Sequence, residues 1–198
     1  GTVALLIEVG TGEIVRRFEG HTEAITSVDF SPDGALAVTG SYDSSVILWD
    51  VDTGQMRYRL QGHTAFVNDV DFSPDGIHVL SAGEDAVLWD ITTGELVRRF
   101  RGHLSDVNTV KFNPNGTQFL SGSRNGSIIL WDLERGDLIR HIPEQMSGLR
   151  NAAFTPDSNY HLYSMLQESE VFLVDSLTGE IAQRLDGHTY YVSTIATS

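Results

Sequence analysis

The chain has 198 residues, of which 40% are hydrophobic and 20% are charged, a composition that is typical of a folded domain and excludes a disordered chain. Thirteen basic residues against 27 acidic ones give a net charge of −14. Because DNA, RNA and anionic membranes bind basic surfaces, this charge excludes them as the expected partners.

The chain opens on a phrase that returns several times. The stretch SSVILWDVDTGQMRYRLQGH at residues 44–63 recurs as AVLWDITTGELVRRFRGH at 86–103, with looser copies at 4–21 and 170–188. Gly-His pairs lie at 20–21, 62–63, 102–103 and 187–188, so one pair is missing near 144–145. Internal repeats of 20 to 50 residues indicate stacked structural units, and the period here is about 40 residues.

One repeat is predicted to form four short strands. The expected strands cover 25–30, 36–40, 46–50 and 55–60, and Ile25 lies out of phase with the alternation of Val28 and Phe30, which indicates a bulge. The stretch SPDG at 31–34 predicts a tight turn between the first two strands, because Pro and Gly favour the two backbone conformations that a turn requires. No segment shows a helical period.

The remaining chain follows the same plan with an incomplete unit at each end. Residues 3–18 predict only a third and a fourth strand, and residues 190–196 predict only a first strand. The predicted divisions are these: a partial unit at 1–19, full units at 20–61, 62–101, 102–143 and 144–186, and a partial unit at 187–198.

The period, the Gly-His pairs and the Trp-Asp pairs at 49–50, 89–90 and 131–132 together resemble the WD40 repeat family. The resemblance covers nearly the whole chain and implies an all-β fold, a β-propeller of four-stranded antiparallel blades. Propellers of this family usually have about seven blades. The sequence is therefore expected to be one propeller segment, 1–198, whose missing blades come from a longer chain or from self-association.

The resemblance also implies a hydrogen-bonded chain in each blade, running from the Gly-His histidine through a Ser or Thr and a turn carboxylate to the tryptophan. Carried onto this sequence, the residues are His21, Thr39, Asp43 and Trp49; His63, Ser81, Asp85 and Trp89; and His103, Ser121, Asn125 and Trp131. The fourth unit offers Gln145, Ser164, Glu168 and Val174, so its network is expected to be largely lost.

Two sharper interpretations of these residues compete with burial in a core. His, Ser or Thr, and Asp are also the parts of a nucleophilic triad, but an enzyme rarely needs three equivalent nucleophiles. The histidines lack the short spacing of metal ligands, and without cysteine neither a thiolate metal site nor a disulfide forms. We expect no catalytic residue, no metal and no cofactor.

Positions that vary between the copies are the candidates for recognition. In the family, the residues before the first strand and in the turn after the second strand lie on one rim of the propeller. The six candidates at these positions include the aromatic and Arg residues that are enriched in binding hot spots: Tyr42, Phe66, Glu84, Asp106, Arg124 and Tyr191.

The sequence therefore predicts a non-catalytic scaffold that binds a peptide or a protein domain at its rim. The alternative is a propeller enzyme or small-molecule sensor, for which Asp29, Asp71 and Lys111 are the charged residues on the innermost strands. No run of about 18 apolar residues and no charged-then-apolar leader occurs. With the absence of cysteine, this favours a cytoplasmic location.

Overall fold

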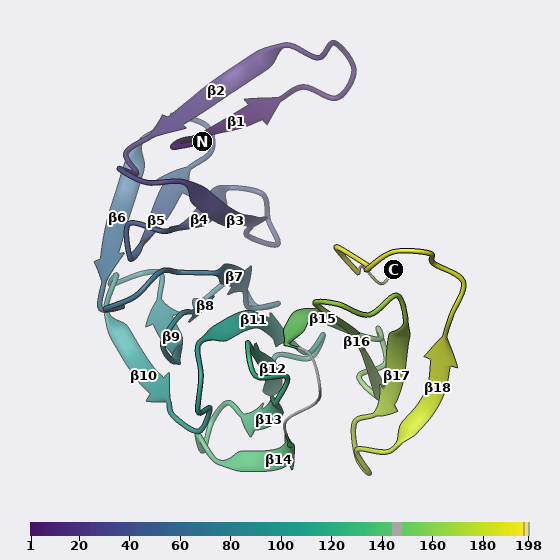
Figure 1. Ribbon diagram of the computed structural model, residues 1–198. Coiled ribbons are helices and arrows are strands. Elements are labelled where there is room, and N and C mark those ends of the chain that lie inside the picture. The colour runs from purple at the N-terminus through teal and green to yellow at the C-terminus, as the bar shows by residue number, and fades with distance from the viewer. Residues whose placement is uncertain (144–147, 196, 198) are drawn as a thin grey trace. The chain divides into compact units, whose positions relative to one another are not determined.

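The structure, a computed structural model, describes residues 1–143, 148–195 and 197, and every regular element in these ranges is a β-strand (Figure 1). The all-β expectation is confirmed. The chain forms two compact units, residues 1–99 and 100–198, which are described separately. The assignment of 1–198 to one propeller segment stays a prediction.

Unit 1 contains a two-stranded sheet and two four-stranded sheets, in the orders β1-β2, β3-β4-β5-β6 and β10-β9-β8-β7. Blade 1 denotes β3 to β6 and blade 2 denotes β7 to β10. The strands are β1 (Val3–Ile7), β2 (Ile14–Glu19), β3 (Ile25–Phe30), β4 (Leu36–Ser41), β5 (Ser45–Asp50), β6 (Met56–Gln61), β7 (Asp69–Phe72), β8 (His78–Ala82), β9 (Ala86–Asp90) and β10 (Leu96–Phe100).

Unit 2 contains two further four-stranded sheets, blade 3 (β11 to β14) and blade 4 (β15 to β18). The strands are β11 (Val107–Phe112), β12 (Gln118–Ser123), β13 (Ile128–Asp132), β14 (Leu138–Ile142), β15 (Leu149–Phe154), β16 (Tyr160–Met165), β17 (Val171–Asp175) and β18 (Ile181–Leu185). The prediction of a strand at 190–196, the first strand of the last partial unit, is wrong, because residues 190–195 form no strand. A lone first strand has no second strand with which to form a ladder.

Local sequence explains the strand boundaries. In β3 the pairing with β4 shifts register between Ile25 and Ser27, where the broken alternation predicts a bulge. In the SPDG turn, Gly34 has a φ of 71°, and the Asp33 carboxylate accepts a hydrogen bond from Ala35 N at 3.0 Å. Gly76 and Gly116 repeat this backbone conformation.

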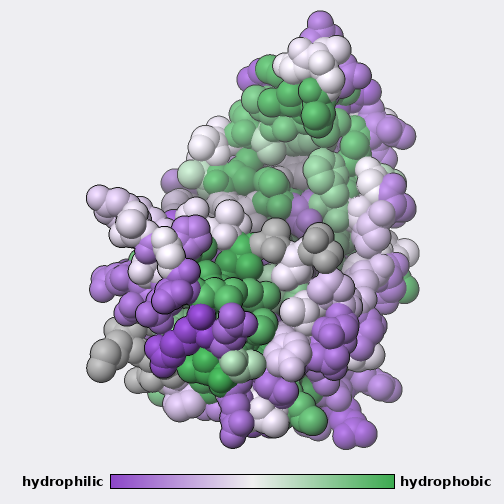
Figure 2. All heavy atoms as spheres, turned by 90° about the vertical axis from the view of Figure 1, so that its right-hand side faces the viewer, coloured by the Kyte–Doolittle hydropathy of each residue, from purple (hydrophilic) through white to green (hydrophobic). Residues whose placement is uncertain are grey.

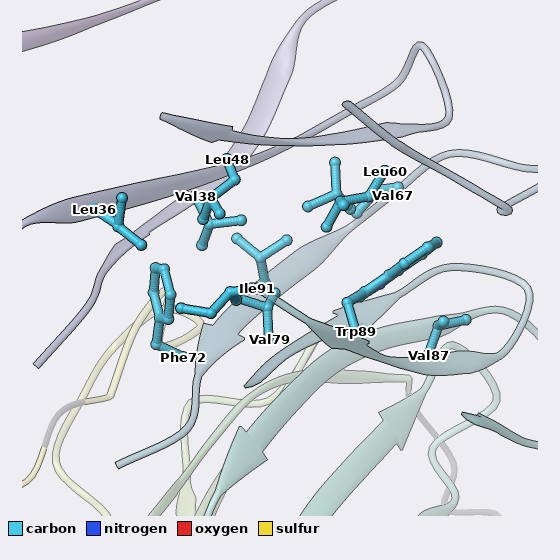
Figure 3. Packing of buried hydrophobic residues seen from close by; sticks show 12 residues of the cluster. Leu36, Val38, Leu48, Leu60, Val67, Phe72, Val79, Val87, Trp89 and Ile91 are labelled. Atoms are coloured by element: carbon cyan, nitrogen blue, oxygen red, sulfur yellow. The ribbon is translucent and has the colours of Figure 1, made fainter. Parts of the chain in front are cut away.

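The core of unit 1 lies between the facing sheets of blades 1 and 2 (Figure 3). Apolar side chains from β4, β5 and β6 interdigitate with side chains from β7, β8 and β9. The labelled residues are Leu36, Val38, Leu48, Leu60, Val67, Phe72, Val79, Val87, Trp89 and Ile91. Since a single blade cannot bury the apolar side chains on its two faces, each blade is stabilised by packing on its neighbour.

The sheet of β1 and β2 covers blade 1 only in part. Phe18 packs on Ile47 and Trp49, but the half-blade has no inner strands that could cover β3. Val28 and Phe30 are 57% and 48% exposed, whereas their equivalents in β7 are buried. The upper part of Figure 2 shows the resulting hydrophobic surface where Figure 1 places β1 to β3.

Unit 2 has an equivalent core between blades 3 and 4. The cluster joins side chains of β12 and β13 to side chains of β15, β16 and β17. Its members are Leu120, Ile128, Leu130, Leu149, Ala152, Phe154, Tyr163, Met165 and Val174. Gly122 permits the close approach of the two blades, because a Cβ at this position would lie 1.7 Å from Leu149 Cδ2.

Phe30 and Phe72 occupy the same position of the repeat and differ in burial, which gives a matched pair of substitutions. Phe72 is 6% exposed, so Phe72→Ala is expected to lower the free energy of unfolding by about 3–5 kcal/mol. Phe30→Ala should cost less than about half of that, because part of its surface already faces water. Urea denaturation of both variants measures the difference, and equal losses would contradict the assigned burial.

Candidate functional site

The predicted network of blade 1 is present in the structure. Trp49 Nε1 donates to Thr39 Oγ1 at 2.8 Å, and Thr39 Oγ1 lies 2.7 Å from His21 Nε2. His21 Nδ1 lies 2.9 Å from Asp43 Oδ2, which only accepts, so in the neutral ring Nδ1 carries the proton and Nε2 accepts from Thr39. The four side chains thus form one continuous chain of hydrogen bonds.

The Gly of each Gly-His pair is explained by the tryptophan. A Cβ at Gly20 would lie 2.9 Å from Trp49 Cη2, and a Cβ at Gly62 would lie equally close to Trp89 Cη2. A side chain at either position would therefore displace the indole ring. The Gly-His turn and the Trp of the third strand are two halves of one packed arrangement.

Blade 2 keeps the same chain of hydrogen bonds but uses a different carboxylate. His63 Nε2 lies 2.7 Å from Ser81 Oγ, which accepts from Trp89 Nε1, and His63 Nδ1 lies 2.9 Å from Glu84 Oε2. The prediction of Asp85 for this place is wrong. The turn is two residues shorter than in blade 1, and the longer Glu84 side chain spans the distance; Asp85 Oδ2 lies 3.8 Å from Arg99 Nη1.

In blade 3 the carboxylate is replaced by a hydroxyl and an amide. Trp131 Nε1 donates to Ser121 Oγ, which lies 2.7 Å from His103 Nε2. His103 Nδ1 contacts Ser127 Oγ at 2.8 Å, and Ser127 Oγ donates to Asn125 Oδ1. Asn125 therefore belongs to the network, but it reaches the imidazole of His103 through Ser127 and not directly as predicted.

Blade 4 retains little of the network. Val174 replaces the tryptophan, and Gln145 lies outside the described residues. Among the residues that the structure describes, the buried Ser164 Oγ and His161 Nε2 have no hydrogen-bond partner. Glu168 is exposed. His161, which the sequence interpretation treated as isolated, is 1% exposed and lies 3.2 Å through Nδ1 from Ser176 Oγ.

The carboxylates of the network are held in their charged form. Burial by itself raises the pKa of Asp43 and of Glu84, but the hydrogen bonds that each accepts outweigh it. For Asp43 these come from Ser45, Thr22 N and His21, and the pKa falls well below its usual range. The pKa of Glu84 falls to about 2, chiefly through His63.

The histidines without a carboxylate are held neutral. Burial, followed by the charge of His141, lowers the pKa of His103 to about 4, and burial lowers that of His161 to about 4. Burial also lowers the pKa of His63, although Glu84 opposes the change. Burial is therefore the largest cause of the lowered pKa in all three of these histidines.

This network is built for stability. The hydroxyls that a nucleophilic triad would use, in Thr39, Ser81 and Ser121, are buried between an indole N–H and an imidazole, away from any substrate. Within the ranges that the structure describes, no three His, Asp or Glu residues gather as a metal site. The same ranges hold no helix that is long and apolar enough to cross a membrane.

Two of the candidate recognition residues meet in unit 1. Tyr42 lies in the turn after β4 and Phe66 in the loop before β7, and their ring centroids are 4.9 Å apart at an interplanar angle of 48°. Tyr42 is 45% exposed and Phe66 is 59% exposed. The two blades together present one aromatic pair to solvent.

The other candidates are arranged differently. In unit 2, Arg124 N donates to Asp106 O at 2.9 Å, both residues being exposed, and Arg150 lies over the Tyr191 ring at 4.9 Å. The Glu84 carboxylate contacts His63 and, at 3.1 Å, Arg99 Nη1, so Glu84 belongs to the network and its part in recognition stays a prediction. The sequence interpretation gave Arg99 no part in the network, although an arginine ten residues after both Trp49 and Trp89 was a visible signal.

The acid assignment in blade 2 can be tested with adjacent alanine substitutions. Glu84→Ala removes the acceptor of His63 Nδ1 and of Thr64 N, and should lower the free energy of unfolding by about 2 kcal/mol. Asp85→Ala should cost less than half as much, because its ion pair with Arg99 is longer. Thermal or urea unfolding compares the two; a larger loss for Asp85→Ala would restore the original assignment.

The pH dependence of unit 2 follows from its two depressed histidines. Unfolding returns His103 and His161 to a pKa of about 6.5, so the unfolded chain binds more protons between pH 6.5 and 4. Their stabilisation is fully present above pH 6.5 and is lost as the pH falls toward 4. Denaturation across this range, followed by the fluorescence of Trp131, should show the decline.

Asn125→Asp should reduce that loss, since a negative charge near His103 Nδ1 favours the protonated imidazole and raises its pKa. The gain in stability at pH 5 should be about 1 kcal/mol. Asn115→Asp adds the same charge in an exposed turn of the same unit and is the control. An NMR titration of His103 that is alike in both variants would refute the expectation.

Comparison with known proteins gives the family. The family model described as WD domain, G-beta repeat matches residues 12–50, 54–90 and 94–132, together more than half of the chain. Each match runs from one blade's outer strand into the next blade's third strand.

Individual relatives match over short segments. A POC1 centriolar protein homolog A of Danio rerio is 56% identical over 34 residues, which is 17% of this chain and 8% of that protein. The guanine nucleotide-binding protein subunit beta of Saccharomyces cerevisiae is 48% identical over 42 residues (21% and 10%), and Protein ROOT INITIATION DEFECTIVE 3 of Arabidopsis thaliana is 41% identical over 44 residues (22% and 10%). The aligned segments span about a tenth of these relatives. On the family match, the repeated four-stranded sheets and their networks, the chain belongs to the WD40 repeat family.

Proposed function

We propose that the chain is a non-catalytic protein-interaction platform that binds a peptide or protein segment on the aromatic pair of Tyr42 and Phe66. The observation that carries this proposal is the contact of two large, exposed rings contributed by neighbouring blades. Exposed aromatic side chains that are already ordered by one another lose little freedom on binding, which is typical of interface anchors.

The scaffold beneath the rings supports this proposal. Tyr42 N donates to Ala24 O at 3.0 Å, and the adjacent Asp43 is fixed by His21 and Ser45. The structural network therefore fixes the turn that carries Tyr42. A platform of this kind is preorganised, so binding energy is not spent on ordering the site.

The comparisons and the charge agree with a protein partner. One relative is, by its name, a subunit of a guanine nucleotide-binding protein, so that chain works within an assembly. The net charge of −14 favours partners with basic or neutral surfaces over nucleic acid. We also propose a cytoplasmic location, which rests on the absence of cysteine.

The alternative of an enzyme or sensor gains less support. Of the charged residues on the inner strands, Asp29 accepts a hydrogen bond from Phe72 N through Oδ2 at 2.8 Å and so links β3 to β7. Asp69, on the same inner strand as Phe72, likewise accepts from Ser27 Oγ at 2.8 Å. These carboxylates hold adjacent blades together.

Peptides selected from a displayed random library on the 198-residue chain test the proposal. Their affinities, measured by fluorescence polarisation, should fall at least about tenfold with Phe66→Ala or with Tyr42→Ala. Val97→Ala, an exposed apolar residue on β10, serves as the control and should leave affinity unchanged. Selected peptides that bind the Tyr42→Ala, Phe66→Ala double variant as well as the native chain would overturn the proposal.

A further inference from the structure

Unit 2 contains a hollow of about 300 Å³ beside the His103 network. This volume is at the lower end of the range of ligand pockets, ~300–1,000 Å³. Its lining comes from the Gly-His turn, the turn after β12 and the end of β14: Gly102, Leu104, Asn125, Ser127, His141 and Pro143. Blade 3 thus has an opening next to the outer end of its own hydrogen-bond network.

Blade 1 shows what occupies this position when no hollow is present. Arg59, ten residues after Trp49, donates to Gly20 O and, at 2.8 Å, to Ser45 Oγ. Its Nη1 also lies 3.6 Å from Asp43 Oδ2. The guanidinium therefore closes the space between the Gly-His turn and the network acid.

Blade 2 repeats the arrangement with its own residues. Arg99, ten residues after Trp89, donates to Gly62 O and lies 3.1 Å from Glu84 Oε1. In two blades, then, an arginine of the fourth strand binds the carbonyl of the Gly in Gly-His and the acid that orients the histidine.

Blade 3 has a histidine in place of this arginine. His141 pairs with Ile129 in the register in which Arg59 pairs with Ile47. The two positions that accept hydrogen bonds from Arg59, Gly20 and Ser45, correspond to Gly102 and Ser127, and both line the hollow. A shorter side chain has thus replaced the arginine, and the residues that surround an arginine elsewhere remain.

The walls of the hollow also suit an arginine. Leu104 occupies the position of Thr22 in blade 1 and Thr64 in blade 2, directly after the Gly-His pair. Together with Pro143 it offers an apolar surface to the methylene groups of an arginine side chain. Ser127 and Asn125 place oxygen atoms at the polar end. A planar guanidinium donates several hydrogen bonds in fixed directions, whereas an ammonium does not.

We propose that this hollow binds the guanidinium group of an arginine side chain presented by a partner protein. The incoming arginine takes the place that Arg59 and Arg99 occupy in blades 1 and 2. This site is independent of the aromatic pair in unit 1, and it gives blade 3 a specificity for arginine over lysine. The acidic net charge of the chain favours the approach of such a cation.

The test uses the 198-residue chain at neutral pH and N-acetyl-L-arginine amide as the probe, followed by the imidazole NMR signals of His103. We expect saturable shifts with a Kd of about 1–10 mM, as befits a single small side chain. The lysine analogue should bind at least about threefold more weakly. An arginine-containing peptide then distinguishes a protein-borne arginine from the free amino acid, by binding more tightly than the probe.

Two substitutions, His141→Arg and Asn125→Asp, should change binding in opposite directions, and Gln183→Arg is the control. His141→Arg supplies the missing side chain from β14 and should abolish the shifts, whereas Gln183→Arg on exposed β18 adds the same charge and should leave them intact. Asn125→Asp places an acid as in blades 1 and 2 and should tighten binding severalfold. Shifts that persist in His141→Arg, that are equal for the lysine analogue, or that ignore Asn125→Asp would overturn the proposal.

Discussion

Each third-strand tryptophan brings one N–H donor into the buried core, and the structure is arranged around pairing it. The indole donates to a Ser or Thr hydroxyl, and the hydroxyl pairs with a histidine from the turn that precedes the blade. Because an unpaired buried donor costs about 1–3 kcal/mol, this short chain of bonds fixes the second strand, the third strand and the turn together. Where Val174 replaces the tryptophan, the hydroxyl of Ser164 finds no hydrogen-bond partner within 1–143 and 148–195.

The buried end of the network is constant and the outer end is variable. Trp, hydroxyl and imidazole recur with nearly the same distances, but Nδ1 of the imidazole meets Asp43, Glu84 or Ser127 in successive blades. An arginine lies beside the acid in blades 1 and 2, and His141 takes its position in blade 3. The outer residues of the network can therefore differ from blade to blade while the packing of the core stays the same.

The same division explains the recognition surface. The Tyr42 turn is anchored through Asp43 to His21, and the Phe66 loop follows the Gly-His pair of the next blade. Packing of blades 1 and 2 through their apolar faces brings these two loops together, so the aromatic pair is a product of blade stacking. In unit 2 the altered residues Leu104, Asn125 and His141 surround a hollow instead.

The sequence by itself determined the strand order, the turns and most of the network, because these depend on local periodicity and on residues at fixed spacing. The tertiary structure alone decided which acid reaches a histidine: Glu84 succeeds where Asp85 does not, since side-chain length and turn length act together. It also decided that Phe72 is buried and Phe30 is not, and that replacing an arginine by His141 leaves a hollow. Burial and cavities depend on neighbours distant in sequence, and no local pattern contains them.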